Sequence, residues 1–94
     1  MNCVSKNIIY LMTCLGCKKI YIGETGICLN LRINLHRQQI EHKKYTILNV
    51  STHIQKCGKS FSILPMFQLP NDCEYLRKKQ EIYFINLLQP ELNQ

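Results

Sequence analysis

No stretch of this sequence is long and apolar enough to span a membrane, which requires about 18 consecutive apolar residues. The N-terminus also lacks a basic flank followed by a long apolar segment, so we expect neither a secretory signal nor a membrane partner. Internal repeats, low-complexity tracts and linkers are absent as well. The 94 residues, 46% of them apolar, are expected to form one folded domain over residues 1–94, which could be cut from a longer protein.

Acidic residues are scarce in the chain. Six Asp and Glu stand against twelve Lys and Arg, which gives a formal net charge of +6. A basic balance of this size favours polyanions such as DNA, because neutralised phosphates release condensed counterions. A basic surface that is merely solvated is the alternative interpretation.

The pattern of apolar residues predicts a small α/β (α+β) domain. Runs of β-branched residues between turns indicate strands, whereas apolar residues three and four apart indicate helices. Pro65 lacks an N–H group, so its strand is expected at a sheet edge or at a bulge. The order of elements gives a three-stranded, largely antiparallel sheet flanked by helices. The expected strands cover about residues 7–13, 19–23 and 61–69, and the expected helices about 27–42, 47–55 and 72–88.

Turns and caps are expected between these elements. Residues 24–26 are predicted to form a turn before the first helix, and the basic residues 43–45 to close that helix near the negative end of its dipole. Asn71 is the expected N-cap of the last helix, with Glu74 three residues on as the partner in a capping box.

Two tyrosines fall on the first two expected strands. Tyr10 ends one apolar run and Tyr21 lies in the next, with the short turn from Cys14 to Cys17 between them. Apolar and β-branched residues on both sides of a turn predict a hairpin. This hairpin would hold two phenols on paired strands beside a possible metal-binding turn.

Six cysteines in a short chain indicate either disulfides or metal binding. The missing secretory signal favours metal binding. Cys14 and Cys17 are two residues apart around Gly16, and His53 and Cys57 are four apart, so a helical turn would point both the same way. Three thiolates and an imidazole would make a closed tetrahedral site for structural zinc. The alternatives are four unrelated residues in a reduced chain, or a disulfide framework. The other cysteines are expected to be small apolar side chains: Cys3, Cys28 and Cys73.

Two polar residues fall on the inward arc of the first expected helix. Leu29, Ile33, His36 and Ile40 form its apolar stripe, and Arg32 lies inside the same arc. Arg32 can extend its charge to solvent from such a position, and His36 can be an ordinary hydrogen-bonded core residue. The functional interpretation is a guanidinium in a cleft, where its planar fork suits phosphate oxygens, with His36 one turn away.

Glu81 is a carboxylate inside an apolar arc of the last expected helix. A structural ion pair with Arg77, four residues earlier, is one interpretation. The other is that Glu81 holds a metal ion or orients a reactant. The arc is expected to contain Leu76, Tyr83, Phe84, Ile85, Leu87 and Leu88.

In order and spacing, these residues resemble a GIY-YIG endonuclease domain, most closely the kind attached to Penelope-like retroelement reverse transcriptases. The first half-motif is Ile8-Ile9-Tyr10, with isoleucine where the family has glycine, and the second is Tyr21-Ile22-Gly23, followed by Glu24-Thr25-Gly26. Cys57 stands where that subgroup often has a histidine. The further matching residues are Arg32, His36, His53, Glu81 and Asn93.

The resemblance implies metal-assisted hydrolysis of a DNA phosphodiester for retroelement integration. A single active centre per domain favours nicking of one strand, with double cuts only by dimers or sequential hits. In that scheme Glu81 holds one Mg²⁺ or Mn²⁺, and Arg32 neutralises charge on the phosphate. Tyr10 is the general base and Tyr21 orients the water or the phosphate, while His36 and Asn93 support them by hydrogen bonding. The residues expected to grip the DNA backbone are Lys18, Lys19, Lys43 and Lys44.

The same resemblance implies fusion to a reverse transcriptase and a place inside the cell, in the nucleus. Two other classes of function stay open from the residues themselves. One is a zinc-stapled DNA-binding module that targets a fused enzyme without chemistry of its own. The other is a small secreted domain held by disulfides, without zinc.

Overall fold

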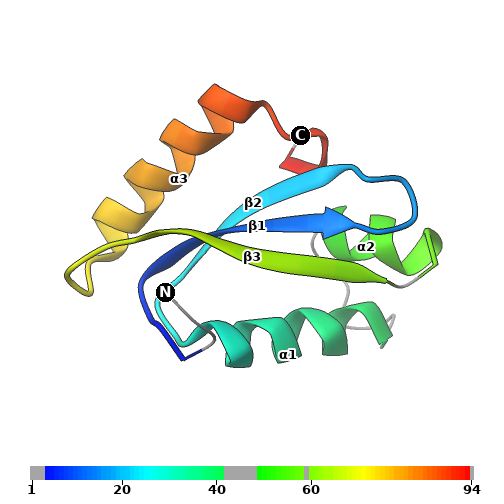
Figure 1. Ribbon diagram of the computed structural model, residues 1–94, viewed down its shortest axis with the longest axis horizontal. Coiled ribbons are helices and arrows are strands. Elements are labelled where there is room, and N and C mark those ends of the chain that lie inside the picture. Colours follow the sequence, from blue (N-terminus) through cyan, green and yellow to red (C-terminus); the bar gives the residue numbers. More distant parts are fainter. Residues whose placement is uncertain (1–3, 42–48, 59, 94) are drawn as a thin grey trace.

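The computed structural model describes residues 4–41, 49–58 and 60–93, and in this part of the chain three strands form one antiparallel sheet (Figure 1). The hairpin strands are β1 (Ile8–Cys14) and β2 (Ile20–Thr25), and β3 (Phe61–Gln68) pairs with the other side of β1. The strand order is therefore β2-β1-β3. The helices are α1 (Leu29–Glu41), α2 (Asn49–Lys56) and α3 (Glu74–Leu88), followed by the short 3₁₀ helix η2 (Glu91–Asn93). The predicted α+β architecture is confirmed.

The expected position of Pro65 is confirmed on both counts. β3 is an edge strand, and its register with β1 shifts between Ile9 and Tyr10, where Pro65 stands opposite Tyr10. An edge position and a bulge both tolerate a residue that cannot donate a backbone hydrogen bond.

Two expected boundaries are wrong. Glu24 and Thr25 continue β2, because they pair with Ile9 and Ile8 rather than forming a turn. α3 begins at Glu74 with Cys73 at its N-cap and no side-chain capping bond, so the capping box at Asn71 is not formed. The predicted basic closure at 43–45 lies outside the described residues.

Two apolar clusters hold helices on opposite faces of the sheet. Alternate residues of β1 face α1 and α2, where Leu29, Ile40, Val50 and Ile54 complete a buried core. The other residues of β1 face α3, but that second core is small, with Ile9, Ile22 and Leu69 buried in it. The larger core lies between the sheet and the first two helices.

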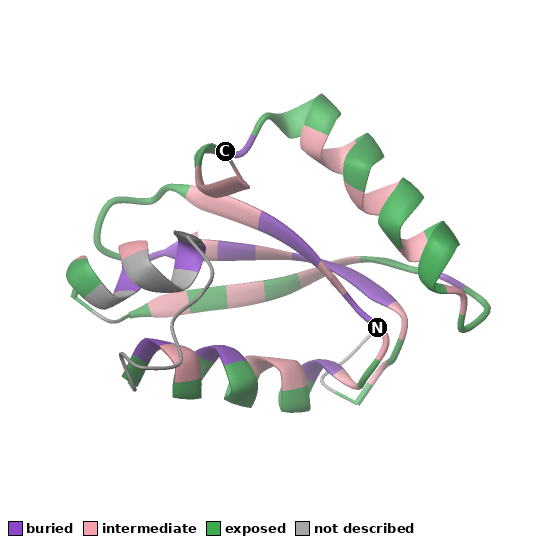
Figure 2. Cartoon of the chain, turned by 180° about the vertical axis from the view of Figure 1, so that it is seen from behind, coloured by how far each residue is buried: buried purple, intermediate pink, exposed green. Residues whose placement is uncertain are grey.

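The predicted apolar arc of α3 packs only in part. Phe84 and Ile85 lie against the sheet, yet no residue of α3 is buried, and the helix carries no buried segment in Figure 2. Four of the six residues expected in the arc are at least 41% exposed: Leu76, Tyr83, Leu87 and Leu88. In the described part of the chain no helix has the length and apolar character needed to cross a membrane.

Candidate active site and metal centre

Tyr10 points from the central strand toward α1 and is fully buried. Gly23 lies directly opposite it on β2. A Cβ atom at position 23 would collide with the Tyr10 hydroxyl. The glycine that ends the second half-motif therefore makes room for the phenol of the first.

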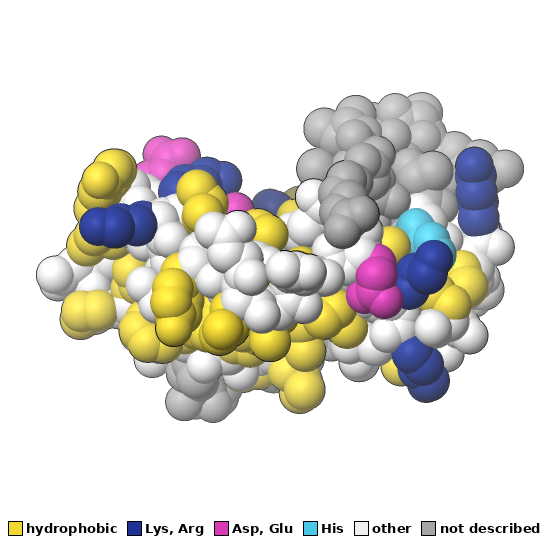
Figure 3. All heavy atoms as spheres, turned by 90° about the horizontal axis from the view of Figure 1, so that it is seen from above, with side chains coloured by type: hydrophobic (Ala, Val, Ile, Leu, Met, Phe, Trp, Pro, Cys, Tyr) yellow, Lys and Arg dark blue, Asp and Glu magenta, His cyan; other side chains and the backbone are white. Residues whose placement is uncertain are grey.

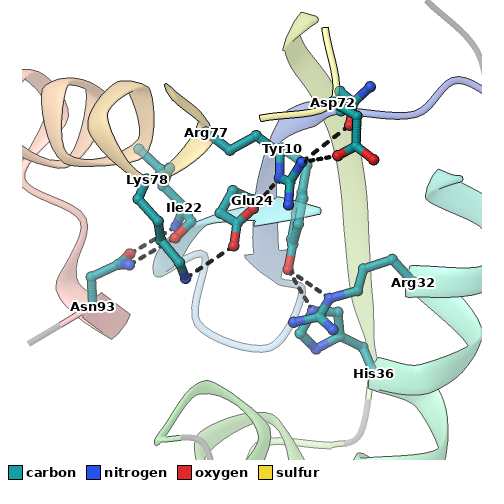
Figure 4. Close-up of polar contacts among 10 residues, drawn as sticks. Tyr10, Ile22, Glu24, Arg32, His36, Asp72, Arg77, Lys78 and Asn93 are labelled. Atoms are coloured by element: carbon teal, nitrogen blue, oxygen red, sulfur yellow. Dashed lines mark hydrogen bonds and ion pairs between the residues drawn. The ribbon is translucent and has the colours of Figure 1, made fainter. Parts of the chain in front are cut away.

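The Tyr10 hydroxyl lies between two side chains of α1 (Figure 4). It is 2.8 Å from His36 Nε2, and Arg32 Nε donates a hydrogen bond to it over 3.4 Å. The Tyr21 ring lies beside them, with its centroid 6.5 Å from that of Tyr10 and 6.4 Å from that of His36. The structure thus brings together four of the predicted site residues, from β1, β2 and α1.

Burial determines which of the side chains around the Tyr10 hydroxyl are protonated. It lowers the pKa of His36 to about 4, with help from the positive charge of Arg32, so the ring is neutral at pH 7. A neutral Nε2 can accept the Tyr10 hydroxyl proton, which leaves the ring proton on Nδ1. This Nδ1 is buried and has no hydrogen-bond partner among the described residues. Burial also raises the pKa of Tyr10 and of Tyr21, so both phenols are protonated at rest.

Glu24 is a carboxylate near these residues, and the sequence pattern predicted no role for it. Arg77 Nε and Lys78 Nζ bind its two oxygens at 2.8 and 2.9 Å (Figure 4). Burial acts to raise the pKa of Glu24, but the two cations outweigh burial and hold that pKa below its usual value. Because residues 24–26 were expected to be a turn, nothing in the pattern indicated that Glu24 would face α3.

Arg77 fastens the start of α3 to the sheet. Besides Glu24, its guanidinium binds Asp72 at 2.6 Å and the side-chain oxygen of Asn7 at 3.2 Å. It turns away from Glu81, so the structural Arg77–Glu81 pair considered above is not formed. Glu81 makes no ion pair with Arg77, although the charge of Lys78 acts to lower its pKa.

Glu81 is half-buried on α3, one turn beyond Arg77. Burial raises the pKa of its carboxyl group, and the negative charge of Glu24 adds to this, while the backbone of Glu24 donates a hydrogen bond to it. Its charge also acts to raise the pKa of both Tyr10 and Tyr21. Electrostatically, Glu81 therefore belongs to the same site, and an oxygen donor held in this way fits a hard divalent cation.

An open cleft of about 280 Å³ adjoins the tyrosine group. Two guanidinium groups line it, from Arg32 on α1 and Arg77 on α3, together with residues 24–27. The Arg77 guanidinium is already bound to Glu24 and Asp72, so Arg32 is the group whose planar fork can bind phosphate oxygens beside Tyr10.

Asn93 does not join the tyrosines. Its side-chain oxygen accepts from the Ile22 N–H at 2.7 Å, and its amide donates to the Ile22 carbonyl at 2.8 Å (Figure 4). The side chain thus satisfies both backbone groups of one residue on the free edge of β2. In this structure its contact is with the strand that carries Tyr21 rather than with the phenols.

The four expected zinc ligands gather at the far end of the hairpin. The donor atoms of Cys14, Cys17, His53 and Cys57 all lie within 4.8 Å of one another, and Cys17 Sγ is 3.0 Å from His53 Nε2. Tetrahedral zinc with Zn–S bonds of about 2.3 Å separates sulfur atoms by about 3.8 Å, so the cluster fits such an ion.

The local backbone supports this cluster. A Cβ atom at Gly16 would come within 2.6 Å of the Cys57 sulfur and carbonyl oxygen, so the turn can approach α2 this closely only with glycine. Burial acts to raise the pKa of Cys14, but hydrogen bonds from the backbone of Gly16 and Cys17 and from neighbouring thiols hold it below its usual value. Cys28 and Cys73 lie outside the cluster.

Comparison with known proteins agrees with this geometry. A family model described as the GIY-YIG catalytic domain matches residues 6–93, which is nearly the whole chain. Comparisons with curated proteins and with solved structures find no match. Both half-motif tyrosines, the Gly23 contact and the Arg32 side chain lie inside the matched range and converge in space. The chain therefore belongs to the GIY-YIG family of nuclease catalytic domains.

Proposed function

We propose that this chain is a divalent-metal-dependent endonuclease that hydrolyses DNA phosphodiester bonds. The observation that carries the proposal is the Tyr10 hydroxyl held between Arg32 and His36, beside the half-buried Glu81. A base, a phosphate-binding cation and a metal-ligating carboxylate are the groups that such a hydrolysis needs.

Tyr10 would take the proton from the attacking water, with His36 holding its hydroxyl in place. Burial raises the pKa of Tyr10, which makes the phenol a poor base at pH 7, but the hydrogen bond and charge of Arg32 act to lower that pKa, and a cation held at Glu81 would lower it further. The water oxygen forms a bond to phosphorus, the bond to the leaving sugar oxygen breaks, and that oxygen is protonated from solvent. Arg32 stabilises the charge on the non-bridging oxygens.

Glu81 would hold one Mg²⁺ or Mn²⁺. When bound there, the cation supplies positive charge to the phosphate and its leaving oxygen. Glu24 keeps its own charge occupied by Arg77 and Lys78, so Glu81 is the carboxylate left for a metal. Tyr21 would orient the water or the phosphate, and Asn93 would support the site by fixing β2.

Zinc is the metal that we propose for the Cys14–Cys17–His53–Cys57 cluster. Three sulfurs and one imidazole leave no open position, so the ion would join the hairpin to α2 and not act on substrate. The exposed Lys18 and Lys19 on the same turn would contact the DNA backbone.

The resemblance noted in the sequence supports a narrower proposal. A GIY-YIG domain with two cysteines between its half-motifs would serve a Penelope-like retroelement, joined to a reverse transcriptase and acting in the nucleus. One active centre per chain favours nicking of a single strand at a time.

A second candidate function is a zinc-stapled DNA-binding module without chemistry. The observation that favours it is the position of the exposed Lys18 and Lys19 directly after Cys17 of the metal cluster. In that case DNA binding would survive the loss of Glu81, and no cleavage would be seen.

Nicking of supercoiled plasmid in Mg²⁺ or Mn²⁺ tests the proposal, with Glu81→Gln as the variant and Glu74→Gln as the matched control. Both changes remove one charge from α3, but Glu74 is exposed in the first turn. We expect nicked circles from the parent and from Glu74→Gln, and a loss of about 100-fold or more in Glu81→Gln. Equal nicking by both variants would contradict the role of Glu81. Tight plasmid binding by a parent that cuts nothing would favour the binding module.

A further inference from the structure

α3 has apolar side chains on both sides, although only one side packs against the sheet. Phe84 and Ile85 face the second core, whereas Tyr75, Ile82 and Leu87 are 72%, 56% and 62% exposed. Figure 3 looks onto the side of the molecule that carries α3 and shows hydrophobic side chains gathered over it. Lys79 and Asn86 lie among these residues, but large exposed apolar side chains gathered on one surface mark an interaction site, so the outward side of α3 is expected to be covered.

The outward residues have the spacing of a helix-pairing seam. Tyr75 and Leu76 recur seven residues later as Ile82 and Tyr83, and Leu87 follows four residues after Tyr83. Positions seven apart fall on one stripe of a helix and are the ones that pack against a second helix. We call these five residues the α3 seam.

The apolar surface continues from the seam onto β3. The Tyr83 and Phe84 rings are 5.3 Å apart, and the Phe84 and Phe67 rings 6.0 Å apart, so the aromatic contacts run from α3 to the edge strand. Phe67 and Leu64 are themselves 38% and 60% exposed. One continuous surface therefore covers the outward side of α3 and the adjoining part of the sheet.

We propose that a second copy of this chain covers this surface, with the two α3 helices packed antiparallel about a two-fold axis. The seam can pair with itself under reversal, because a centre between Glu81 and Ile82 places Leu76 opposite Leu87 of the second copy. The Lys79 side chains would be staggered along the pair, and their flexible stems can carry both charges to solvent.

The exposed area agrees with a stable dimer. At about 180 Å² for each large side chain when fully exposed, the seam with Leu64 and Phe67 offers on the order of 700 Å². A standard interface buries about 800 Å² on each partner, whereas the largest apolar patch of a typical monomer is about 300–600 Å². An isologous contact of this size closes on itself as a dimer.

Pairing would also change how DNA is cut, and this consequence rests on the proposed nuclease function. Glu81 points to the sheet side of α3, so pairing through the outward side leaves both active sites open. Two centres related by a two-fold axis can cut both strands of one DNA molecule in a single encounter. A single chain cuts one strand in each encounter.

Sedimentation equilibrium of the 94-residue chain tests the pairing, with Tyr83→Glu/Leu87→Glu as the disrupting variant. Leu31→Glu is the control, because Leu31 is 51% exposed on α1, away from the seam. We expect the parent and the control to have twice the 11.1 kDa chain mass, and the disrupted variant to be a folded monomer whose dimer Kd is raised 100-fold or more. A parent that stays monomeric at 100 µM, roughly the upper range of such assays, or a disrupted variant that still dimerises, would overturn the proposal.

Plasmid products separate this inference from the proposed function. If both hold, the dimer yields linear DNA early in the reaction, whereas the disrupted variant yields nicked circles with linear product delayed. A dimeric parent that cuts no DNA would refute the nuclease but leave the pairing intact. A monomeric parent that nicks would refute the pairing and support the nuclease.

Discussion

At the scale of single residues, the site depends on a histidine that stays uncharged. Burial and Arg32 lower the pKa of His36 to about 4, from about 6.5 in an unfolded chain. Between these two values the unfolded chain binds a proton that the folded chain does not. Neutral His36 therefore costs no stability above pH 6.5. The free energy of unfolding falls progressively as the pH drops from 6.5 to 4.

The first prediction concerns this pH window. Acidification from pH 7 to pH 4.5 should destabilise the parent by about 2 kcal/mol more than His36→Gln, which has no titrating ring. Urea unfolding of both proteins at the two pH values measures the difference. Equal losses in the two proteins would show that His36 does not titrate with a lowered pKa.

The second prediction concerns the carboxylate that faces Arg77 and Lys78. Glu24→Gln removes a negative charge that contributes to the raised pKa of Glu81, so the acid limb of the nicking rate should move to lower pH. Asp72→Asn is the matched control, since it removes a carboxylate from the same arginine at a position 80% exposed. If both variants shift the limb alike, or neither does, Glu24 has no specific effect on Glu81.

The sequence predicted part of this site, and contacts explain the rest. Helical spacing placed Arg32 and His36 on the inward arc, and strand alternation placed both phenols on the hairpin, so their convergence follows from local pattern. Glu24 could not be found in this way, because its role depends on two cations of α3 about 53 residues away. Asn93 was expected to support the site by hydrogen bonding, and its bonds to Ile22 are a long-range contact that no local pattern records.

At the scale of elements, the hairpin turn and α2 meet at the metal cluster. Short β elements with a small core gain stability from a metal that joins distant segments, since the binding free energy becomes folding free energy. The two half-sites were predicted from spacing alone. The two half-sites are about 36 residues apart along the chain, and the core beneath α2 brings them together in space.

The third prediction is spectroscopic and thermal. Removal of the metal by chelation should lower Tm by about 10 °C or more, because a closed site of this kind contributes several kcal/mol. With Co²⁺ in place of zinc, Cys57→His should keep tetrahedral bands but lose about one third of the thiolate charge-transfer intensity. Cys28→Ser, outside the cluster, should leave the spectrum unchanged. Unaltered intensity in Cys57→His would remove Cys57 from the ligand set.

The predicted elements and their order are correct because each has a recognisable periodicity or a residue that limits it, such as Pro65 in the edge strand. The start of α3 was not predicted correctly. Asp72 binds Arg77, and the helix begins at Glu74 without the predicted cap. The apolar arc of α3 was read as core, but the sheet has room for only one side of that helix, and sequence periodicity cannot tell an internal surface from one that binds a partner.

At the scale of the whole molecule, charge and shape agree with a protein that approaches DNA. The net charge of +6 attracts phosphates without reading sequence, and the open cleft lined by Arg32 and Arg77 lies where the end of β2 meets α1 and α3. The described lysines of the hairpin turn extend the basic surface toward the metal cluster. DNA binding should therefore weaken steeply with salt, independently of any change at the tyrosines.

The central claim is that Tyr10 handles the proton of the attacking water. Tyr10→Phe removes one buried hydroxyl, and Tyr75→Phe removes one from a side chain that is 72% exposed, so the pair isolates the position of the hydroxyl. Plasmid nicking by both variants, with plasmid binding measured in parallel, is the most direct test. The account predicts that Tyr10→Phe binds like the parent and nicks about 100-fold or more slowly, while Tyr75→Phe nicks at the parental rate. Nicking by Tyr10→Phe at the rate of Tyr75→Phe would contradict it.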